Sequence, residues 1–276
     1  MKRKSKKLWV IVGAVLGVIG ITLGITFGTM AALGAKQPAD YRENLPLRFI
    51  AHRGLSSQYA ENTEAAFLAA AKSPFFYGIE TDVYFTTDDV AVCAHDDNAF
   101  QDDSVRITGS IYAEIENLPL KESSYGFSGS EICTFATYLS ICRQYDKVAV
   151  IELKQPSIDS EQIKTLIKLA KYYCNDRFVL ISFSLQQVKM AEQTDASVVT
   201  QHLSGNPSTG RMSLLQGYNV SLSKGAVNAA LIRSAHRKGR EVGVWTVNTI
   251  EEVGRLAALG VDYVTTDYDF SGVRNV

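Results

Sequence analysis

Cysteine pairs of the kind that bind zinc are missing from this sequence. Its four cysteines are Cys93, Cys133, Cys142 and Cys174, and none belongs to a Cys-x-x-Cys motif, so a zinc site is not indicated. Outside the cell an even number of cysteines could form disulfides. Cys93 lies inside an apolar run, where a thiol behaves as a small buried hydrophobic group, and the sequence assigns no pairing. The chain also lacks a basic stripe or basic–aromatic patch of the kind that binds nucleic-acid backbones, so nucleic acid is not an expected partner.

Acidic residues are absent from the first 36 positions, which hold six of the 28 Lys and Arg residues. The remainder has 22 basic residues against 29 acidic ones, a net charge near −7. The sequence therefore predicts an acidic domain behind a basic N-terminal segment.

An uncharged run from Leu8 to Leu33 follows five basic residues between Lys2 and Lys7. The run has 26 residues, whereas about 20 span a bilayer as a helix and a signal-peptide core has about 7–15. We therefore predict an uncleaved transmembrane anchor within residues 1–36, with a cytoplasmic N-terminus and the rest of the chain outside the cell membrane. The small residues at 31–35 leave cleavage as the alternative.

Glycine recurs along the predicted anchor with spacings of three and four residues, which place it on one helix face. The positions are Gly13, Gly17, Gly20, Gly24 and Gly28. Such faces let membrane helices pack closely, so a homodimer through the anchor is one hypothesis. The alternative is the general abundance of glycine in membrane helices.

Apolar, β-rich runs alternate with helical stretches beyond a linker at 37–46. We expect strands near 48–52, 78–85, 90–94, 148–153, 178–183, 197–202, 218–222, 241–247 and 262–265. We expect helices near 62–72, 133–145, 159–174, 185–193, 226–238 and 249–258. Strands that alternate with helices form a parallel sheet. The domain at 47–276 is long enough for one α/β barrel of the TIM-type (β/α)8 class, which takes about 250 residues.

The composition of residues 97–132, which is rich in Ser, Asp, Gly and Glu, predicts an insertion after the second strand, over the barrel mouth.

Carboxylates stand at or near the ends of two of these strands. Glu80 and Asp82 are two residues apart and so share one face of a strand, and Glu152 ends another apolar run. Buried carboxylates repel one another unless a cation lies between them. Oxygen ligands favour a hard ion, so we predict one divalent cation, Mg²⁺ or Ca²⁺, held by all three. The alternative is salt bridging to Arg53 and Lys154 without a metal.

Two histidines, His52 and His95, follow predicted strands and are the candidates for proton transfer. Displacement of an alkoxide by a hydroxyl needs a base for the nucleophile and an acid for the leaving group, and imidazole can serve as either near neutral pH. Arg53 and Lys154 are cations suited to hold a phosphate, the first as a planar fork of donors and the second as a point charge. His202 also follows a strand and is a weaker candidate.

The ordered motifs of the chain resemble those of the glycerophosphodiester phosphodiesterase family, in its membrane-anchored bacterial form. They are His52-Arg53-Gly54, Glu61-Asn62-Thr63, Ala66-Phe67, Glu80-Thr81-Asp82, His95-Asp96, Glu152-Leu153-Lys154, Trp245-Thr246-Val247-Asn248 and Thr266-Asp267. The resemblance covers roughly residues 47–270. The sequence departs from the family where Ala60 replaces a usual proline and in the stretch 97–104 that follows His95-Asp96.

The resemblance implies metal-dependent hydrolysis of glycerophosphodiesters to glycerol 3-phosphate and an alcohol. It assigns proton transfer to His52 and His95 and leaves open which is the acid. Attack by the glycerol 2-hydroxyl, through a cyclic phosphate, and direct attack by water both remain open. Glu61 and Asn62 are expected to support the site by capping and hydrogen bonding, and Trp245 to pack against the glycerol or the alcohol, or simply to fill the core.

An external domain tethered to the membrane would meet lysophospholipids or polyglycerolphosphate polymers as readily as small diesters. Two rival hypotheses stand beside this one. A phosphatidylinositol-type phospholipase C shares the barrel and the pair of histidines, and a non-catalytic, membrane-tethered barrel would act only as a binding module.

Overall fold

The computed structural model describes residues 47–272 of the chain. The predicted anchor and linker lie outside the described residues. Within 47–272, no helix is long and apolar enough to span a bilayer.

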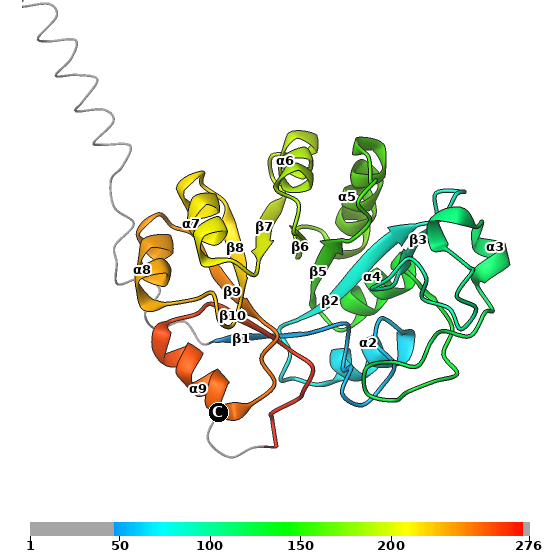
Figure 1. Ribbon diagram of the computed structural model, residues 1–276, viewed down its shortest axis with the longest axis horizontal. Coiled ribbons are helices and arrows are strands. Elements are labelled where there is room, and N and C mark those ends of the chain that lie inside the picture. Colours follow the sequence, from blue (N-terminus) through cyan, green and yellow to red (C-terminus); the bar gives the residue numbers. More distant parts are fainter. Residues whose placement is uncertain (1–46, 273–276) are drawn as a thin grey trace, which may run out of the picture. The chain divides into compact units, whose positions relative to one another are not determined.

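Eight parallel strands close into a barrel, as predicted (Figure 1). In chain order they are β1 Arg48–Ala51, β2 Gly78–Phe85, β5 Val148–Leu153, β6 Phe178–Ser182, β7 Val199–Ser204, β8 Asn219–Ser223, β9 Val242–Trp245 and β10 Tyr263–Thr266. Each strand pairs with the next one in this order, and β1 pairs with both β10 and β2. The sheet therefore has no free edge along these eight strands, and their carboxyl ends form one rim.

Helices follow the barrel strands and pack outside them. They are α2 Glu64–Lys72, α4 Phe135–Gln144, α5 Ser160–Cys174, α6 Leu185–Thr194, α7 Pro207–Leu215, α8 Ala229–Arg237 and α9 Ile250–Leu259. Each begins after a side chain that accepts a hydrogen bond from the first turn, at Thr63, Thr134, Asp159, Ser184, Asn206, Asn228 and Thr249. Six of the seven are predicted from the sequence. The exception is α7, which contains Gly210 and has little apolar periodicity.

The expected strand at 90–94 exists but is not a barrel strand. It is β3, Ala91–Cys93, and it runs antiparallel to β2, with Cys93 opposite Val83. The insertion therefore begins with this return strand and continues through the 3-10 turn Ile107–Gly109 and α3, Tyr112–Ile115. It ends at β4, Cys133–Thr134, which pairs antiparallel with β3. The insertion follows the second barrel strand, as predicted, and lies at the right of Figure 1.

Three separate apolar clusters support these elements. The largest fills the space between the barrel and its helices, and a second lies inside the barrel around Ile50, Val148, Val150, Ile181 and Leu203. The third belongs to the insertion and is built from Tyr84, Val92, Ala94, Phe100, Ile107, Ile115, Leu120 and Ile132. All four cysteines are buried with free thiols.

Candidate active site

His52 and Asp267 each stand one residue beyond the end of a barrel strand. The register of β1 and β10 pairs Ala51 with Thr266, and the His52 amide donates to the carbonyl of Thr266 at 2.9 Å. The next residues of the two strands are thereby brought together, and Nδ1 of His52 lies 2.7 Å from Oδ1 of Asp267. Strand register alone places a carboxylate against the histidine.

Asp267 is the centre of a hydrogen-bond cluster. Besides His52, its carboxylate accepts from Ser56 Oγ at 3.1 Å, Tyr125 OH at 2.8 Å and Asn248 Nδ2 at 2.6 Å. Burial raises the pKa of Asp267, but these donors and His52 outweigh it and lower the pKa to about 2. The carboxylate is therefore ionised and holds the His52 ring by its Nδ1.

The three predicted carboxylates meet on the inner face of two adjacent strands. Asp82 of β2 is paired in register with Glu152 of β5, and Glu80 lies two residues earlier on β2. One oxygen from each lies within 4.8 Å of the others, and all three residues are buried. The cluster stands above the apolar layer formed by Val148 and Val150.

Burial affects the three acids unequally. Burial, with the charges of Asp82 and Glu152, raises the pKa of Glu80 well above its usual value. The pKa of Glu152 is raised by burial and by Asp82. Burial also acts on Asp82, but Arg53 and Lys154 outweigh it and lower the pKa. A cation held among the three oxygens would offset the unfavourable free energy of keeping Glu80 and Glu152 ionised while they are buried beside other negative charges.

Arg53 connects two parts of the site. Its amide donates to Glu80 Oε2 at 2.9 Å, and its guanidinium donates to Glu61 Oε1 at 2.6 Å. Nε lies 3.3 Å from Asp82 Oδ2, and burial, which lowers the arginine pKa, is outweighed by the surrounding acids, so the pKa rises. The backbone has a left-handed φ of 56°, a conformation that costs about 1–3 kcal/mol in a non-glycine residue and is commonest at functional sites.

Lys154 stands just beyond β5 and contacts two of the acids. Its Nζ lies 3.1 Å from Glu152 Oε1 and 3.4 Å from Asp82 Oδ1. Burial lowers the lysine pKa, but these carboxylates outweigh it and the pKa rises, so the ammonium stays charged. The salt bridges expected as the alternative to a metal are therefore present, and whether they exclude a metal depends on the balance of charge.

The balance of charge at the site favours binding of a divalent cation. Four carboxylates, those of Glu61, Glu80, Asp82 and Glu152, face only two cations, Arg53 and Lys154. Two negative charges are in excess when all are ionised. Oxygen ligands of this kind suit Mg²⁺ or Ca²⁺. The donor set fits the predicted ion.

The side-chain amide of Asn62 fixes the position of Asp82 through hydrogen bonds. Its Nδ2 donates to Asp82 Oδ2 at 2.9 Å, and its Oδ1 accepts from Thr81 Oγ1 at 2.8 Å and from the Asp82 amide at 3.3 Å. A φ of 58° suits asparagine better than most residues. Glu61 and Asn62 thus hydrogen-bond to Arg53 and Asp82, whereas the cap of α2 is Thr63 and not one of these two residues.

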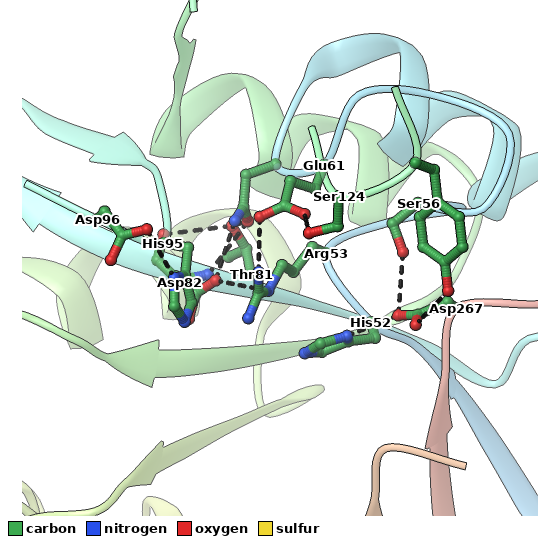
Figure 2. Close-up of polar contacts among 12 residues, drawn as sticks. His52, Arg53, Ser56, Glu61, Thr81, Asp82, His95, Asp96, Ser124 and Asp267 are labelled. Atoms are coloured by element: carbon green, nitrogen blue, oxygen red, sulfur yellow. Dashed lines mark hydrogen bonds and ion pairs between the residues drawn. The ribbon is translucent and has the colours of Figure 1, made fainter. Parts of the chain in front are cut away.

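His95 reaches the same site by a different route from His52. It follows the return strand β3, which leads back alongside β2 until the Ala94 amide donates to the carbonyl of Asp82 at 3.0 Å. His95 interacts electrostatically with Asp82 and Glu152, which places it beside the same carboxylates. Its Nδ1 lies 3.0 Å from Oδ2 of Asp96. In Figure 2, His95 and His52 lie on opposite sides of Arg53.

Trp245 ends β9 beside the barrel interior rather than among the carboxylates. Its Nε1 donates to the carbonyl of Ser221 at 3.1 Å, and its ring meets Phe183 edge-on at 5.4 Å. Phe183 is half exposed. The indole is therefore part of the wall at the rim, and no contact within 47–272 joins it to the three acids.

Several donors of the site, Ser56 among them, are not predicted from the sequence. Ser124 and Tyr125 lie in the insertion, where no periodicity indicates what they contact, and Asn248 acts on Asp267 rather than on substrate. The late motif that ends at Asn248 was the available signal. His202, the weaker candidate, points away from the site, because its Nδ1 lies 2.7 Å from Ser213 Oγ on α7.

A closed (β/α)8 barrel with two histidines, clustered carboxylates and two cations at one rim defines an enzyme with acid–base chemistry and an anion to bind. The profile of the glycerophosphoryl diester phosphodiesterase family matches residues 52–269, so the match takes in every residue of this site. The chain belongs to this family of enzymes.

Relatives of known name support the assignment. The chain is 31% identical to the Bacillus subtilis protein YhdW over 236 residues, or 79% of this chain and 93% of that protein. It is 29% identical to the glycerophosphodiester phosphodiesterase of Caldanaerobacter subterraneus over 237 residues, with the same coverage. Its fold is similar to that of an Oleispira antarctica phosphodiesterase solved with its product sn-glycerol-3-phosphate, with a TM-score of 0.70, 22% identity and coverage of 81% of this chain and 94% of that one.

Proposed function

We propose that this chain hydrolyses glycerophosphodiesters to glycerol 3-phosphate and an alcohol, with a divalent cation and two histidines. The observation that carries the proposal is the cluster of Glu80, Asp82 and Glu152 within 4.8 Å. Arg53 and Lys154 contact its carboxylates, and His52 and His95 lie on opposite sides of Arg53 in Figure 2. Family membership supports the reaction class, and the product held by the Oleispira protein supports glycerol 3-phosphate as the product here.

Glu80, Asp82 and Glu152 are the residues that would hold the cation. When bound, a hard divalent ion supplies Lewis-acid stabilisation of negative charge on phosphate oxygens. Arg53 and Lys154 add fixed positive charge at the same place and orient the phosphate. Because both are already held by carboxylates, little reorganisation is needed when the phosphate arrives.

The two histidines present the same ring atom to the substrate. In each, Nδ1 faces a carboxylate, Asp267 for His52 and Asp96 for His95, so Nε2 is left for proton transfer. One imidazole takes the proton of the attacking hydroxyl, and the other gives a proton to the leaving alkoxide. The attacking hydroxyl belongs either to the glycerol C2 or to water.

The two roles can be separated by the leaving group. p-Nitrophenolate leaves without protonation. A p-nitrophenyl ester substrate should therefore restore most of the rate of the variant that lacks the acid and none of the rate of the variant that lacks the base. His52→Gln and His95→Gln would be compared on glycerophosphocholine and on glycerol 3-(p-nitrophenyl phosphate). Phosphorus NMR during turnover would detect a cyclic phosphate if the glycerol hydroxyl attacks.

The alcohol is proposed to occupy a pocket beside His95. The pocket has a volume of about 190 Å³ and is lined by His95, Glu61 and the insertion residues 120–124. Trp245 and Phe183, on the rim away from this pocket, are proposed to contact the glycerol. A pocket open at the rim also suits lysophospholipids or polyglycerolphosphate polymers, which we propose as further substrates.

The first experiment is release of glycerol 3-phosphate from glycerophosphocholine by the full chain. EDTA should abolish release, Mg²⁺ or Ca²⁺ should restore it, and Glu80→Gln should remove the response to metal. Lysophospholipid and polyglycerolphosphate would be tested in parallel. Failure of all three substrates with every metal would contradict the proposed function and leave the non-catalytic alternative.

We further propose that residues 8–33 anchor the chain in the cell membrane with the barrel outside, on the sequence pattern alone. The full chain should resist extraction from membranes at alkaline pH, and a variant without 8–33 should not. Protease added to intact cells should cleave the barrel only if it is external. A Gly17→Leu, Gly24→Leu pair that leaves association in detergent unchanged would remove the proposed homodimer.

A further inference from the structure

The tip of the insertion contacts the site at two points. Residues 123–127 form a tight turn in which the Ser123 amide donates to the Phe127 carbonyl at 2.8 Å and the Gly126 amide donates to Ser123 at 2.9 Å. Gly126 has a φ of 82°, which suits glycine at such a turn. Adjacent residues of this turn, Ser124 and Tyr125, each donate to a different carboxylate of the site.

Neither carboxylate belongs to the proposed metal set. Tyr125 OH lies 2.8 Å from Oδ2 of Asp267, whose other oxygen holds His52 at 2.7 Å. Ser124 Oγ lies 3.1 Å from Oε2 of Glu61, whose other oxygen holds Arg53 at 2.6 Å. The turn thus reaches one proton-transfer group and one phosphate-binding group, in each case through an intervening acid.

The turn is itself held in place at this position. The ring of Tyr125 meets that of Tyr268 edge-on at 5.8 Å, and Asn248 Nδ2 lies 3.5 Å from the Tyr125 hydroxyl as well as 2.6 Å from Asp267. Behind the turn stands the insertion's own apolar cluster, which includes Leu120. These contacts fix the two hydroxyls against the acids that they reach.

We propose that Ser124 and Tyr125 are positioning residues, through which the insertion sets the orientation of His52 and Arg53. A carboxylate with two donors on separate oxygens cannot rotate without losing one of them, so its geometry toward the histidine or the arginine is fixed. The insertion therefore completes the alignment of the catalytic groups as well as covering the rim. This inference rests on the function proposed above.

A double-mutant cycle tests the route through Asp267. Tyr125→Phe removes one hydroxyl and keeps the ring, and it should lower kcat on glycerophosphocholine about tenfold with KM changed less than twofold. In an Asp267→Asn background the same substitution should change kcat less than twofold, because the partner through which it acts has already been altered. Ser124→Ala should behave likewise, alone and in a Glu61→Gln background. Tyr172→Phe, at an exposed position of α5, is the matched control.

The ¹⁵N signals of the His52 imidazole give a readout independent of turnover, assigned by their loss in His52→Gln. They should shift in Tyr125→Phe and stay unchanged in Tyr172→Phe. An unchanged kcat with unchanged His52 signals would overturn the inference, as would an equal loss of kcat in both backgrounds. A wild-type chain without activity on any diester would instead count against the proposed function, and the imidazole signals would still test the positioning.

Discussion

His52 and Asp267 are 215 positions apart in the chain, yet their side chains lie 2.7 Å from each other. The pairing of β1 with β10, the contact that closes the barrel, accounts for this proximity. The same closure that removes the free edge of the sheet thus assembles the histidine with its carboxylate. Barrel formation and active-site formation are one event at this position.

This pair should make stability depend on pH in acid. The pKa of Asp267 falls from its usual 3.8 to about 2 in the folded chain. A carboxyl group whose pKa is lower in the folded chain than in the unfolded chain stabilises the fold at pH values above its unfolded pKa. This stabilisation is lost as the pH falls from the unfolded pKa through the folded pKa. Between pH 5 and pH 3 we expect wild type to lose about 1 kcal/mol more than Asp267→Asn, measured by urea unfolding. An equal loss of unfolding free energy in wild type and Asp267→Asn would contradict a lowered pKa of Asp267 in the folded chain.

Bound metal should stabilise the fold through the three buried acids. At a concentration about 100 times its dissociation constant, a ligand specific to the folded state adds about 2.7 kcal/mol. We expect Mg²⁺ or Ca²⁺ to raise the melting temperature of wild type and of the control Glu161→Gln, whose side chain is exposed on α5. Glu80→Gln should show no rise. A rise that persists in Glu80→Gln would place the ion elsewhere.

Lys154 should contribute to the rate far more than a surface lysine does. Loss of a preorganised charge at the reacting phosphate typically costs about 10²–10³ in rate. Lys154→Gln should therefore lower kcat/KM about 100-fold. Lys164→Gln, which breaks an exposed pair with Glu161 on α5, should leave kcat/KM within about twofold. Steady-state kinetics on glycerophosphocholine distinguish the two.

His95 and His202 should respond differently to substitution. His95→Gln removes a proton-transfer group and should lower kcat by at least about 10². His202→Gln should leave kcat nearly unchanged but lower the free energy of unfolding by about 1–3 kcal/mol, because it disturbs a buried contact with Ser213. Kinetics and urea unfolding of both variants provide the check. A loss of kcat in His202→Gln while the fold stays intact would show that His202 takes part in the active site.

Gly54 is needed for the close approach of β1 to α2. A Cβ at this position would lie 2.6 Å from the backbone carbon of Ala66, and the φ is 80°. Gly129 has a similar φ of 77° with nothing within 4 Å, so it serves as the matched control. Gly129→Ala should cost about 1 kcal/mol from the backbone alone. Gly54→Ala should cost about 3 kcal/mol or more, because the clash is with backbone.

The barrel and most of its site follow from patterns that the sequence displays directly. Alternating apolar runs predict the eight strands, and the two-residue spacing of Glu80 and Asp82 predicts their shared face. His95 lies beside the carboxylates although it follows an antiparallel return strand and not a barrel strand. That strand direction depends on the β2–β3 turn, which no periodicity reveals.

The residues that escaped prediction act through tertiary contacts. Tyr125 and Ser124 occupy a stretch without periodicity, and their partners lie 142 and 63 positions away. The helix α7 was missed because tertiary packing overrides weak local propensity: Gly210 is tolerated there, where a Cβ would lie 2.6 Å from Leu222 Cδ2 of β8. Contacts of this kind depend on the closed barrel and have no local signature.

The small apolar cluster of the insertion gives that segment a cohesion of its own, built almost entirely from residues 92–132 with Tyr84 as its link to β2. Segments with a separate, smaller core can open while the rest of a protein stays folded. On warming, the insertion is therefore expected to come loose first and to withdraw Ser124 and Tyr125 from the site. Heat inactivation would then precede melting of the barrel, and the gap between the two temperatures would measure how firmly the insertion is held.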